Sequence, residues 1–145
     1  MNPILAIDFG RVRIGVAISD ELQLLAHPLE TIAANERAIA RVAEIVRERK
    51  VDHVVVGIPR QLNGKVGAAA SEAVRFEEKL RAILPCPVVA WDERLTTVAA
   101  HRALREAGKK TRATRHYVDQ VAAQMILQGY LDRRQHAVHV EEMSR

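Results

Sequence analysis

The sequence predicts an α/β domain with a mixed five-stranded sheet and helices on its faces. Two observations lead to this prediction. The first twenty residues contain two apolar runs, 3–7 and 14–18, joined by a short turn with Gly10, which indicates a pair of antiparallel strands. Further along, apolar runs alternate with segments of helical periodicity, so the later strands arrive through helical crossovers and join the sheet in parallel.

Individual residues set the limits of the elements. Pro28 lies inside the third apolar run, 24–32, and suits an edge strand because proline cannot donate a hydrogen bond to a neighbouring strand. Asn35 is a suitable N-cap for the first helix, and Gly108 is a conventional C-cap for a later one. The elements expected after the third strand are helix 35–50, strand 53–58, helix 68–84, strand 87–92, helix 95–107 and helix 117–133.

Composition limits the class of protein. The chain has 145 residues, of which 48% are hydrophobic and 28% charged, which suits one globular domain with a sizeable core. Aromatic residues make up only 3%, which argues against recognition through rows of stacked bases. The lone Cys86 excludes an intramolecular disulfide and a cysteine zinc site. The net charge of +4 permits binding to a polyanion without showing it.

The sequence also predicts the cellular location of the protein and its domain organisation. No apolar run approaches the roughly 18 residues of a membrane span, and the N-terminus does not resemble a signal peptide. We therefore expect a soluble cytoplasmic protein that does not associate with a membrane. A single domain is expected over 1–134, followed by a polar, frayed tail over 135–145. His53, at the entrance of the fourth strand, is expected at the surface.

Four acidic residues stand at predicted element ends. Asp8 ends the first strand, Asp92 and Glu93 end the last, and Asp119 lies in the first turns of the final helix. Parallel strands carry their sites at their carboxyl ends, so Asp8 and Glu93 would share one edge if their strands were adjacent, with Asp119 over them. Clustered carboxylates repel one another, and Mg²⁺ or Mn²⁺ would relieve the repulsion. Two such ions about 3.5–4 Å apart would polarise a phosphodiester and generate the attacking hydroxide.

Each acid also has a structural alternative. Asp8 could cap its own turn, Asp92 or Glu93 could cap the following helix, and Asp119 could complement the dipole at a helix start. The convergence of the acids, rather than any one of them, favours a metal site.

Several side chains could contact phosphate groups. Thr96 and Thr97 could each cap the helix after the last strand or donate to a phosphate. Arg94 could bind phosphate or pair with a neighbouring acid. Both uses remain open for all of these residues.

The basic segment KKTRATRH is expected as a loop beside the acidic edge, where its cations would hold nucleic acid. The alternative is that these cations complement the carboxyl end of the preceding helix. That alternative explains Lys109 and Lys110 better than Arg112 and Arg115, which lie beyond the helix.

The segments LAIDFGRVRIGVAISD, VVVGIPRQLNGKVGAAAS, DERLTT and VDQVAAQMILQGYL resemble the YqgF/RuvX family of the ribonuclease H-like, Holliday-junction-resolvase-like superfamily. DERLTT followed by VDQVAAQMILQ is the specific part, and the loop IPRQLNG departs from the usual Leu-rich version. The resemblance implies a ribonuclease H-like fold and a metal-dependent nuclease that matures the 5′ end of precursor 16S ribosomal RNA. It also implies that Asp8, Glu93 and Asp119 form the acidic triad, with Asp92 ranked lower as a fourth metal ligand.

Three other functions remain open at this stage. A Holliday junction resolvase or DNA-repair nuclease acting on branched DNA would use the same acids, and a homodimer rather than a monomer would favour it. An actin-like or sugar-kinase-like ATPase fragment is suggested by DFGRVRIG, although such ATPases bind nucleotide between two domains and this length supplies one. An inactive RNA-binding module would show no affinity for divalent metal.

Overall fold

The computed structural model describes residues 1–59, 67–95 and 112–144, without the side chains of residues 112–117 and 139. Its sheet confirms the predicted mixed five-stranded architecture, with the strand order β3-β2-β1-β4-β5. The strands are β1 (Ile4–Asp8), β2 (Arg13–Ser19), β3 (Ala26–Ala33), β4 (His53–Ile58) and β5 (Val88–Asp92).

The direction of each strand follows from its connection. β1, β2 and β3 pair antiparallel through short turns, whereas β4 pairs parallel to β1, and β5 parallel to β4. β3 is an edge strand, as Pro28 predicts, and its register against β2 shifts next to that proline. β1 and β5 are not neighbours, because β4 lies between them. The carboxyl ends of all three parallel strands therefore meet at one edge of the sheet.

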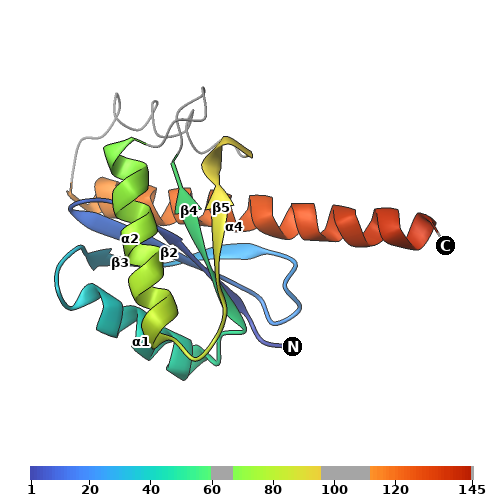
Figure 1. Ribbon diagram of the computed structural model, residues 1–145, viewed down its shortest axis with the longest axis horizontal. Coiled ribbons are helices and arrows are strands. Elements are labelled where there is room, and N and C mark those ends of the chain that lie inside the picture. Colours follow the sequence, from blue (N-terminus) through green and yellow to red (C-terminus); the bar gives the residue numbers. More distant parts are fainter. Residues whose placement is uncertain (60–66, 96–111, 145) are drawn as a thin grey trace.

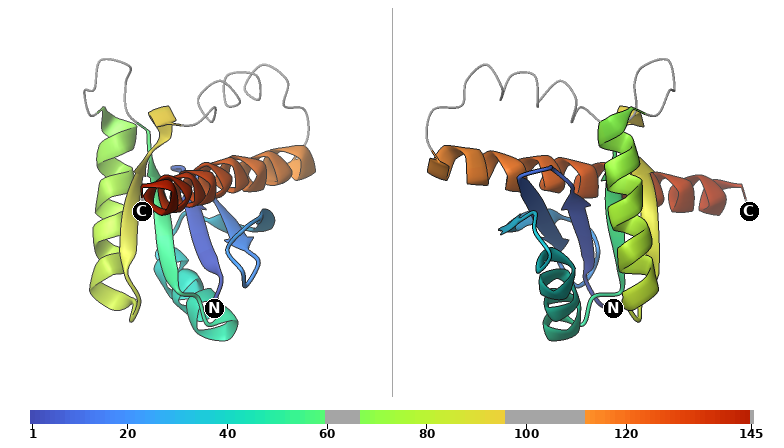
Figure 2. Two further views of the ribbon diagram at one scale, coloured as in Figure 1. Left: turned by 90° about the vertical axis from the view of Figure 1, so that its right-hand side faces the viewer. Right: turned by 60° about the vertical axis from the view of Figure 1, so that its left-hand side comes forward.

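Helices cover both faces of the sheet (Figure 1 and Figure 2). The helices α1 (Ala38–Arg49) and α2 (Ala68–Ile83) lie on one face, and the long helix α4 (Arg112–Met143) crosses the other. Side chains alternate between the two faces along a strand. In β1, Leu5 and Ile7 accordingly pack in the core under α1 and α2, while Ile4 and Ala6 pack under α4. A short 3₁₀ turn, η1 (Glu93–Leu95), follows β5.

The last helix is longer than predicted at both ends. It begins at Arg112 and ends at Met143, so the expected limits of 117 and 133 are wrong, and residues 135–143 are helical rather than frayed. The reason is that residues 112–143 contain no proline and only one glycine, Gly129, so no residue stops the helix at 133. Arg112 and Arg115 consequently belong to a helix and not to a loop. The predicted helix 95–107 extends into residues outside the described ones.

None of the described helices combines the length and the apolar character that crossing a membrane requires. The other predicted limits agree with the structure to within a few residues. The prediction that Asn35 is the N-cap of the first helix is wrong, because α1 begins later, with Arg37 as its N-cap. Asn35 instead accepts a hydrogen bond from the backbone nitrogen of Arg37 at 2.9 Å, in the turn that leads into α1.

The expectation that His53 lies at the surface is wrong. His53 is 7% exposed, and both of its ring nitrogens have partners. Its Nδ1 lies 2.6 Å from the carboxylate of Asp52, and its Nε2 lies 2.8 Å from the hydroxyl of Tyr130 on α4. Burial, the largest cause, raises the pKa of the Tyr130 hydroxyl, which therefore remains protonated at neutral pH. Sequence periodicity did not reveal this contact because its two partners are far apart in the chain.

We predict that Tyr130→Phe lowers the free energy of unfolding by about 1–3 kcal/mol, since it removes the partner of a buried ring nitrogen. The measurement is urea denaturation of the wild type and the variant. The control repeats Tyr130→Phe in a His53→Leu background, where the hydroxyl has no imidazole to contact and its removal should cost much less. Equal losses in the two backgrounds would contradict the proposed contact.

Candidate active site

Three residues in register cross the sheet at the edge where the carboxyl ends of β1, β4 and β5 meet. In the strand register, Asp8 of β1 lies opposite Gly15 of β2 on one side and opposite Gly57 of β4 on the other. Asp8 continues the alternation of Ile4 and Ala6, so its side chain points to the face that α4 covers. A carboxylate between two residues without side chains leaves a notch on each side of it. We call these positions the Gly15 notch and the Gly57 notch.

Asp119 occupies the Gly15 notch. A Cβ atom added to Gly15 would overlap the backbone carbonyl oxygen of Asp119 and would lie 3.3 Å from its Cβ atom. The absence of a side chain at Gly15 therefore lets the backbone of α4 rest directly on β2. This contact brings Asp119, a buried residue with 5% exposure, over the strand next to β1.

Glu93 occupies the Gly57 notch. It follows β5 directly, and β4 separates it from β1. A Cβ atom added to Gly57 would lie 2.9 Å from the Glu93 Oε2 atom and 3.3 Å from its Cγ atom, so the Glu93 side chain extends over β4 toward Asp8. Asp119 and Glu93 therefore lie over the two glycines that flank Asp8, on the face of the sheet that α4 covers.

Arg13 holds Asp119 from the side of the sheet. Its Nε atom donates to the Asp119 Oδ2 atom at 2.6 Å, and the arginine side chain is only 25% exposed. Sequence analysis missed this residue. A signal was present, because Arg13 stands two positions before Gly15 and therefore points to the same face of β2. The positive charge of Arg13 compensates one of the three buried acids, and the ion pair links α4 to β2.

Asp92 and Arg94 pair with each other. The Arg94 Nη2 atom lies 2.6 Å from the Asp92 Oδ2 atom, and the backbone nitrogen of Arg94 donates to the Asp92 Oδ1 atom at 3.0 Å. The hydrogen bond that Arg94 donates to the Asp92 carboxylate raises the pKa of Arg94. Trp91 packs under α4, so its neighbour Asp92 points to the other face and Glu93 returns to the α4 face. Of the two uses proposed for Arg94, the structure shows the pairing with an acid.

The remaining predicted nucleic-acid contacts fall where the structure gives no side chains. Thr96, Thr97, Lys109 and Lys110 lie outside the described residues. Arg112 and Arg115 lie in the first turns of α4, but their side chains are not described.

The donor set suits a hard divalent cation. Three buried acidic residues from β1, η1 and α4 lie on the same side of the sheet, and carboxylate oxygens favour Mg²⁺ or Mn²⁺ as ligands. Within residues 1–59, 67–95 and 112–144, no three acidic, histidine or cysteine side chains already form a metal cage. A shared ion would therefore have to draw the carboxylates closer together.

Comparison with solved structures defines the class of fold. The chain resembles RuvC of Thermus thermophilus in complex with a Holliday junction, with a TM-score of 0.57 and 17% identity over 93% of this chain and 96% of that one. It also resembles the fowlpox virus Holliday junction resolvase, with a TM-score of 0.52 and 16% identity over 90% of this chain and 99% of that one. The fold is thus the ribonuclease H-like fold of the junction resolvases.

Sequence comparison gives the family. The model of the family described as "RuvX: Holliday junction resolvase" matches residues 2–133. A protein of Chloroflexus aggregans named "Putative pre-16S rRNA nuclease" is 51% identical over 133 residues, covering 90% of this chain and 94% of its own. A Nocardia farcinica protein of the same name is 49% identical over 139 residues, covering 90% of this chain and 77% of its own. The chain belongs to the RuvX family, as the sequence motifs indicated.

The Gly57 notch yields a stability prediction. A Cβ atom at this position would lie 2.5 Å from the Ile126 Cδ1 atom as well as 2.9 Å from Glu93 Oε2. Gly57→Ala should therefore destabilise the fold by about 1–3 kcal/mol through overpacking. Adding Ile126→Val removes the clashing Cδ1 atom and should restore part of that loss in urea denaturation.

The same pair of variants separates stability from activity. In the double variant, the new methyl group still displaces Glu93, so nuclease activity should remain low although stability recovers. Ile126→Val alone is the control and should retain activity. Activity that recovers together with stability would show that the Gly57 notch serves packing alone.

Proposed function

We propose that this chain is a divalent-metal-dependent nuclease whose metal is held by Asp8, Glu93 and Asp119, and whose substrate is the precursor of 16S ribosomal RNA. The observation that carries the proposal is the Gly15–Asp8–Gly57 row, which makes room for one further acidic residue on each side of Asp8. The names of its relatives support a nuclease and this substrate. The description of the family supports nucleic acid as the partner.

The chain's own residues supply the binding geometry. Bound Mg²⁺ or Mn²⁺ would polarise a phosphodiester and favour hydroxide over water as the attacking group. Asp8 stands at the end of a central strand, which fixes its position. Asp119 is oriented by Arg13, and Glu93 reaches the site from beyond β4. The three acids are buried and lie on one side of the sheet, so the site favours a cation over any neutral ligand.

The finer assignments depend on this site. We propose Lys109, Lys110, Arg112 and Arg115, with Thr96 and Thr97, as phosphate contacts near the acidic edge, and a cytoplasmic location where precursor ribosomal RNA is found. Asp92 is kept as a lower-ranked metal ligand. Its pairing with Arg94 and its opposite facing within β5 count against that role.

A Holliday junction resolvase is the second candidate. The family description and the fold of RuvC favour it, because the same acids can hydrolyse a phosphodiester in either nucleic acid. The deciding experiment incubates the purified chain with labelled precursor 16S RNA and with a four-way DNA junction, without metal and with Mg²⁺ or Mn²⁺. Metal-dependent cleavage of the RNA alone supports the proposal, and cleavage of the junction alone supports the alternative.

The acid substitutions test the catalytic assignment. Asp8→Asn, Glu93→Gln and Asp119→Asn should each lower cleavage by about 100-fold or more while the fold remains intact, because the amide keeps the shape of the side chain and loses its charge. A double variant should be little worse than either single one, since the three acids act as one unit. The exposed Asp132→Asn on α4 is the control. Asp92→Asn should be mild, and a loss as large as that of Glu93→Gln would reverse our ranking of the two acids.

Arg13 gives a test that does not depend on cleavage. Arg13→Gln leaves the buried Asp119 carboxylate without its guanidinium partner, which should cost roughly 3 kcal/mol, or about 6–12 °C in melting temperature without metal. Millimolar Mn²⁺ should raise the melting temperature of the wild type by binding the folded state. Mn²⁺ should raise the melting temperature of Arg13→Gln by more, because in this variant the ion compensates the negative charge of Asp119 that Arg13 compensates in the wild type.

The matched control is Arg11→Gln. Arg11 lies two residues before Arg13, in the turn that leads into β2, and its partner is the more exposed Glu72 at 2.9 Å. Loss of this pair should therefore cost less than about 1 kcal/mol. Melting curves of wild type, Arg11→Gln and Arg13→Gln that respond equally to Mn²⁺ would contradict the assignment of Asp119 to a metal site.

A further inference from the structure

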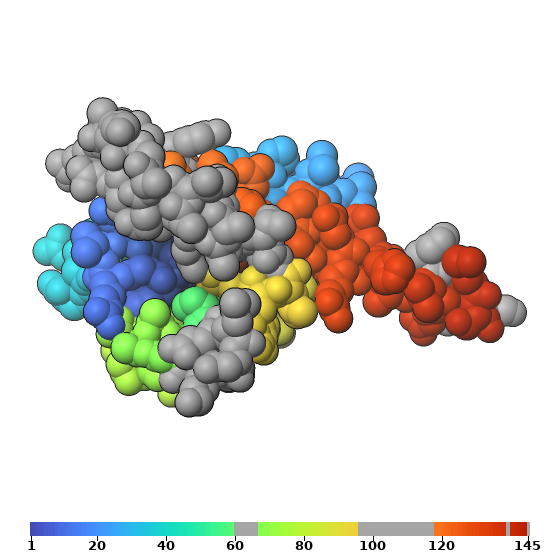
Figure 3. Space-filling model, turned by 90° about the horizontal axis from the view of Figure 1, so that it is seen from above, coloured from blue at the N-terminus to red at the C-terminus, as the bar shows by residue number. Residues whose placement is uncertain are grey.

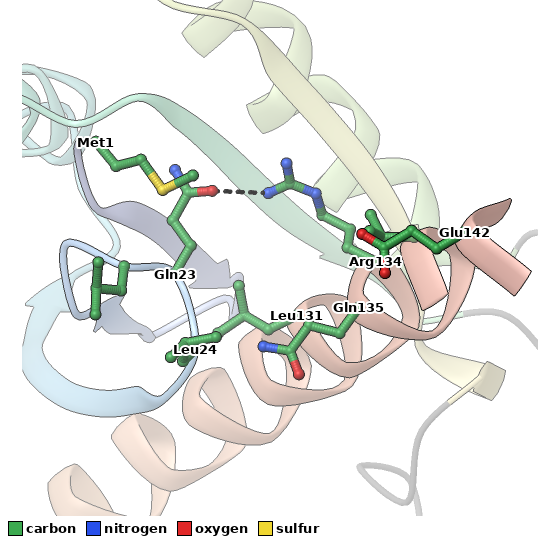
Figure 4. A pocket seen from close by; sticks show the side chains of 9 residues that line it. Met1, Gln23, Leu24, Leu131, Arg134, Gln135 and Glu142 are labelled. Atoms are coloured by element: carbon green, nitrogen blue, oxygen red, sulfur yellow. Dashed lines mark hydrogen bonds between the residues drawn. The ribbon is translucent and has the colours of Figure 1, made fainter. Parts of the chain in front are cut away.

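An apolar pocket of about 290 Å³ lies between the turn joining β2 to β3 and the second half of α4 (Figure 4). Its apolar lining consists of Met1, Leu22, Leu24, Leu131 and Val138. Four of these side chains are well exposed: Met1 by 85%, Leu22 by 66%, Leu24 by 46% and Val138 by 53%. Large exposed apolar side chains gathered at one place on a soluble protein mark an interaction surface.

The part of α4 that borders this pocket extends beyond the body of the molecule (Figure 1 and Figure 3). Every described residue from Asp132 to Ser144 is exposed. A free helical segment of this length is marginal in water, because helices in proteins gain most of their stability from packing. The family match ends at residue 133, so the protruding segment lies outside the part of the chain that the family model describes. The segment and the pocket together form a surface that no described part of the chain covers.

The charges along this surface indicate what covers it. Three of its residues on α4, Arg134, Val138 and Glu142, are spaced by four, so they lie on one side of the helix. Read along the helix, the order is a cation, an apolar residue and an anion. A second helix of the same sequence, running antiparallel, presents the reverse order. Val138 would then face its own counterpart, while Arg134 of each copy would lie beside Glu142 of the other.

We propose that a second copy of this chain packs its α4 antiparallel against this surface, with Val138 near the two-fold axis, to form a symmetric dimer. Such an interface uses the same patch on both copies and must be self-complementary, which this sequence of charges is. Arg134 is already held in place on the surface. It donates to Gln23 at 3.2 Å, and its guanidinium lies 5.6 Å from the centroid of the Tyr130 ring.

The position of the interface leaves the acidic site accessible. Met1, at the pocket, precedes β1, whereas Asp8 ends that strand, so the interface and the carboxylates lie toward opposite ends of the sheet. A dimer of this kind would carry two open acidic edges. This inference does not depend on the proposed function, because association can be measured without metal and without nucleic acid.

A charge exchange between two variants tests the pairing directly. In Arg134→Glu the paired positions are both anionic, and in Glu142→Arg they are both cationic, so each variant alone should dimerise about tenfold more weakly than the wild type. An equimolar mixture of the two restores opposite charges at both contacts and should form a heterodimer as tight as the wild-type dimer. The measurement is sedimentation equilibrium of the full chain over a range of concentrations and salt.

Val138→Asp tests the apolar centre, and circular dichroism would verify that each variant is folded. Val138→Asp should leave the chain monomeric, whereas the matched control Val12→Asp, at an exposed valine outside the patch, should dimerise like the wild type. A wild-type chain that stays monomeric at every concentration would overturn the proposal and leave the patch to a different protein. A dimer insensitive to Val138→Asp, or a mixture no tighter than its components, would also overturn it.

Discussion

The fold depends on the close approach of α4 to the sheet beside a buried carboxylate. Asp8 is tolerated in a central strand because its neighbours on both sides are glycines, and each glycine is covered by a group that carries another acid. Replacing Gly15 with any larger residue would push the backbone of α4 away from β2. The same two residues that permit helix packing therefore also bring the acids together, so a substitution at either glycine affects both packing and chemistry.

The face of the sheet to which each side chain points decides which acid reaches the site. Asp92 and Glu93 are consecutive, and the sequence alone does not show which of them faces Asp8. In the structure, Trp91 faces α4, so Asp92 turns away and is engaged by Arg94, while Glu93 turns back toward the Gly57 notch. The ranking that the family motif implied thus has a geometric basis: Asp92, in β5, faces away from α4, whereas Glu93, in η1, extends over Gly57.

Much of the fold could be predicted from the sequence, because its signals are local. The limits of β4, the edge position of the strand with Pro28 and the strand-end positions of the acids all follow from short runs of residues. The interposition of β4 between β1 and β5, the burial of His53 against Tyr130 and the pairing of Arg13 with Asp119 could not be predicted. Each of these depends on residues far apart in the chain, for which hydrophobic periodicity carries no information.

The acidic site also has a consequence for the order of folding. Its three carboxylates come from residues 8, 93 and 119, so they meet only after contacts of long sequence separation have formed. The β1–β2 hairpin can form early because its contacts are local, whereas the α4–β2 contact closes a loop of about a hundred residues and is entropically costly to form. When synthesis of the chain has reached α2, Asp8 is present but Glu93 and Asp119 have not yet been added. The site is therefore assembled late, and an intact carboxylate cluster reports that tertiary folding is complete.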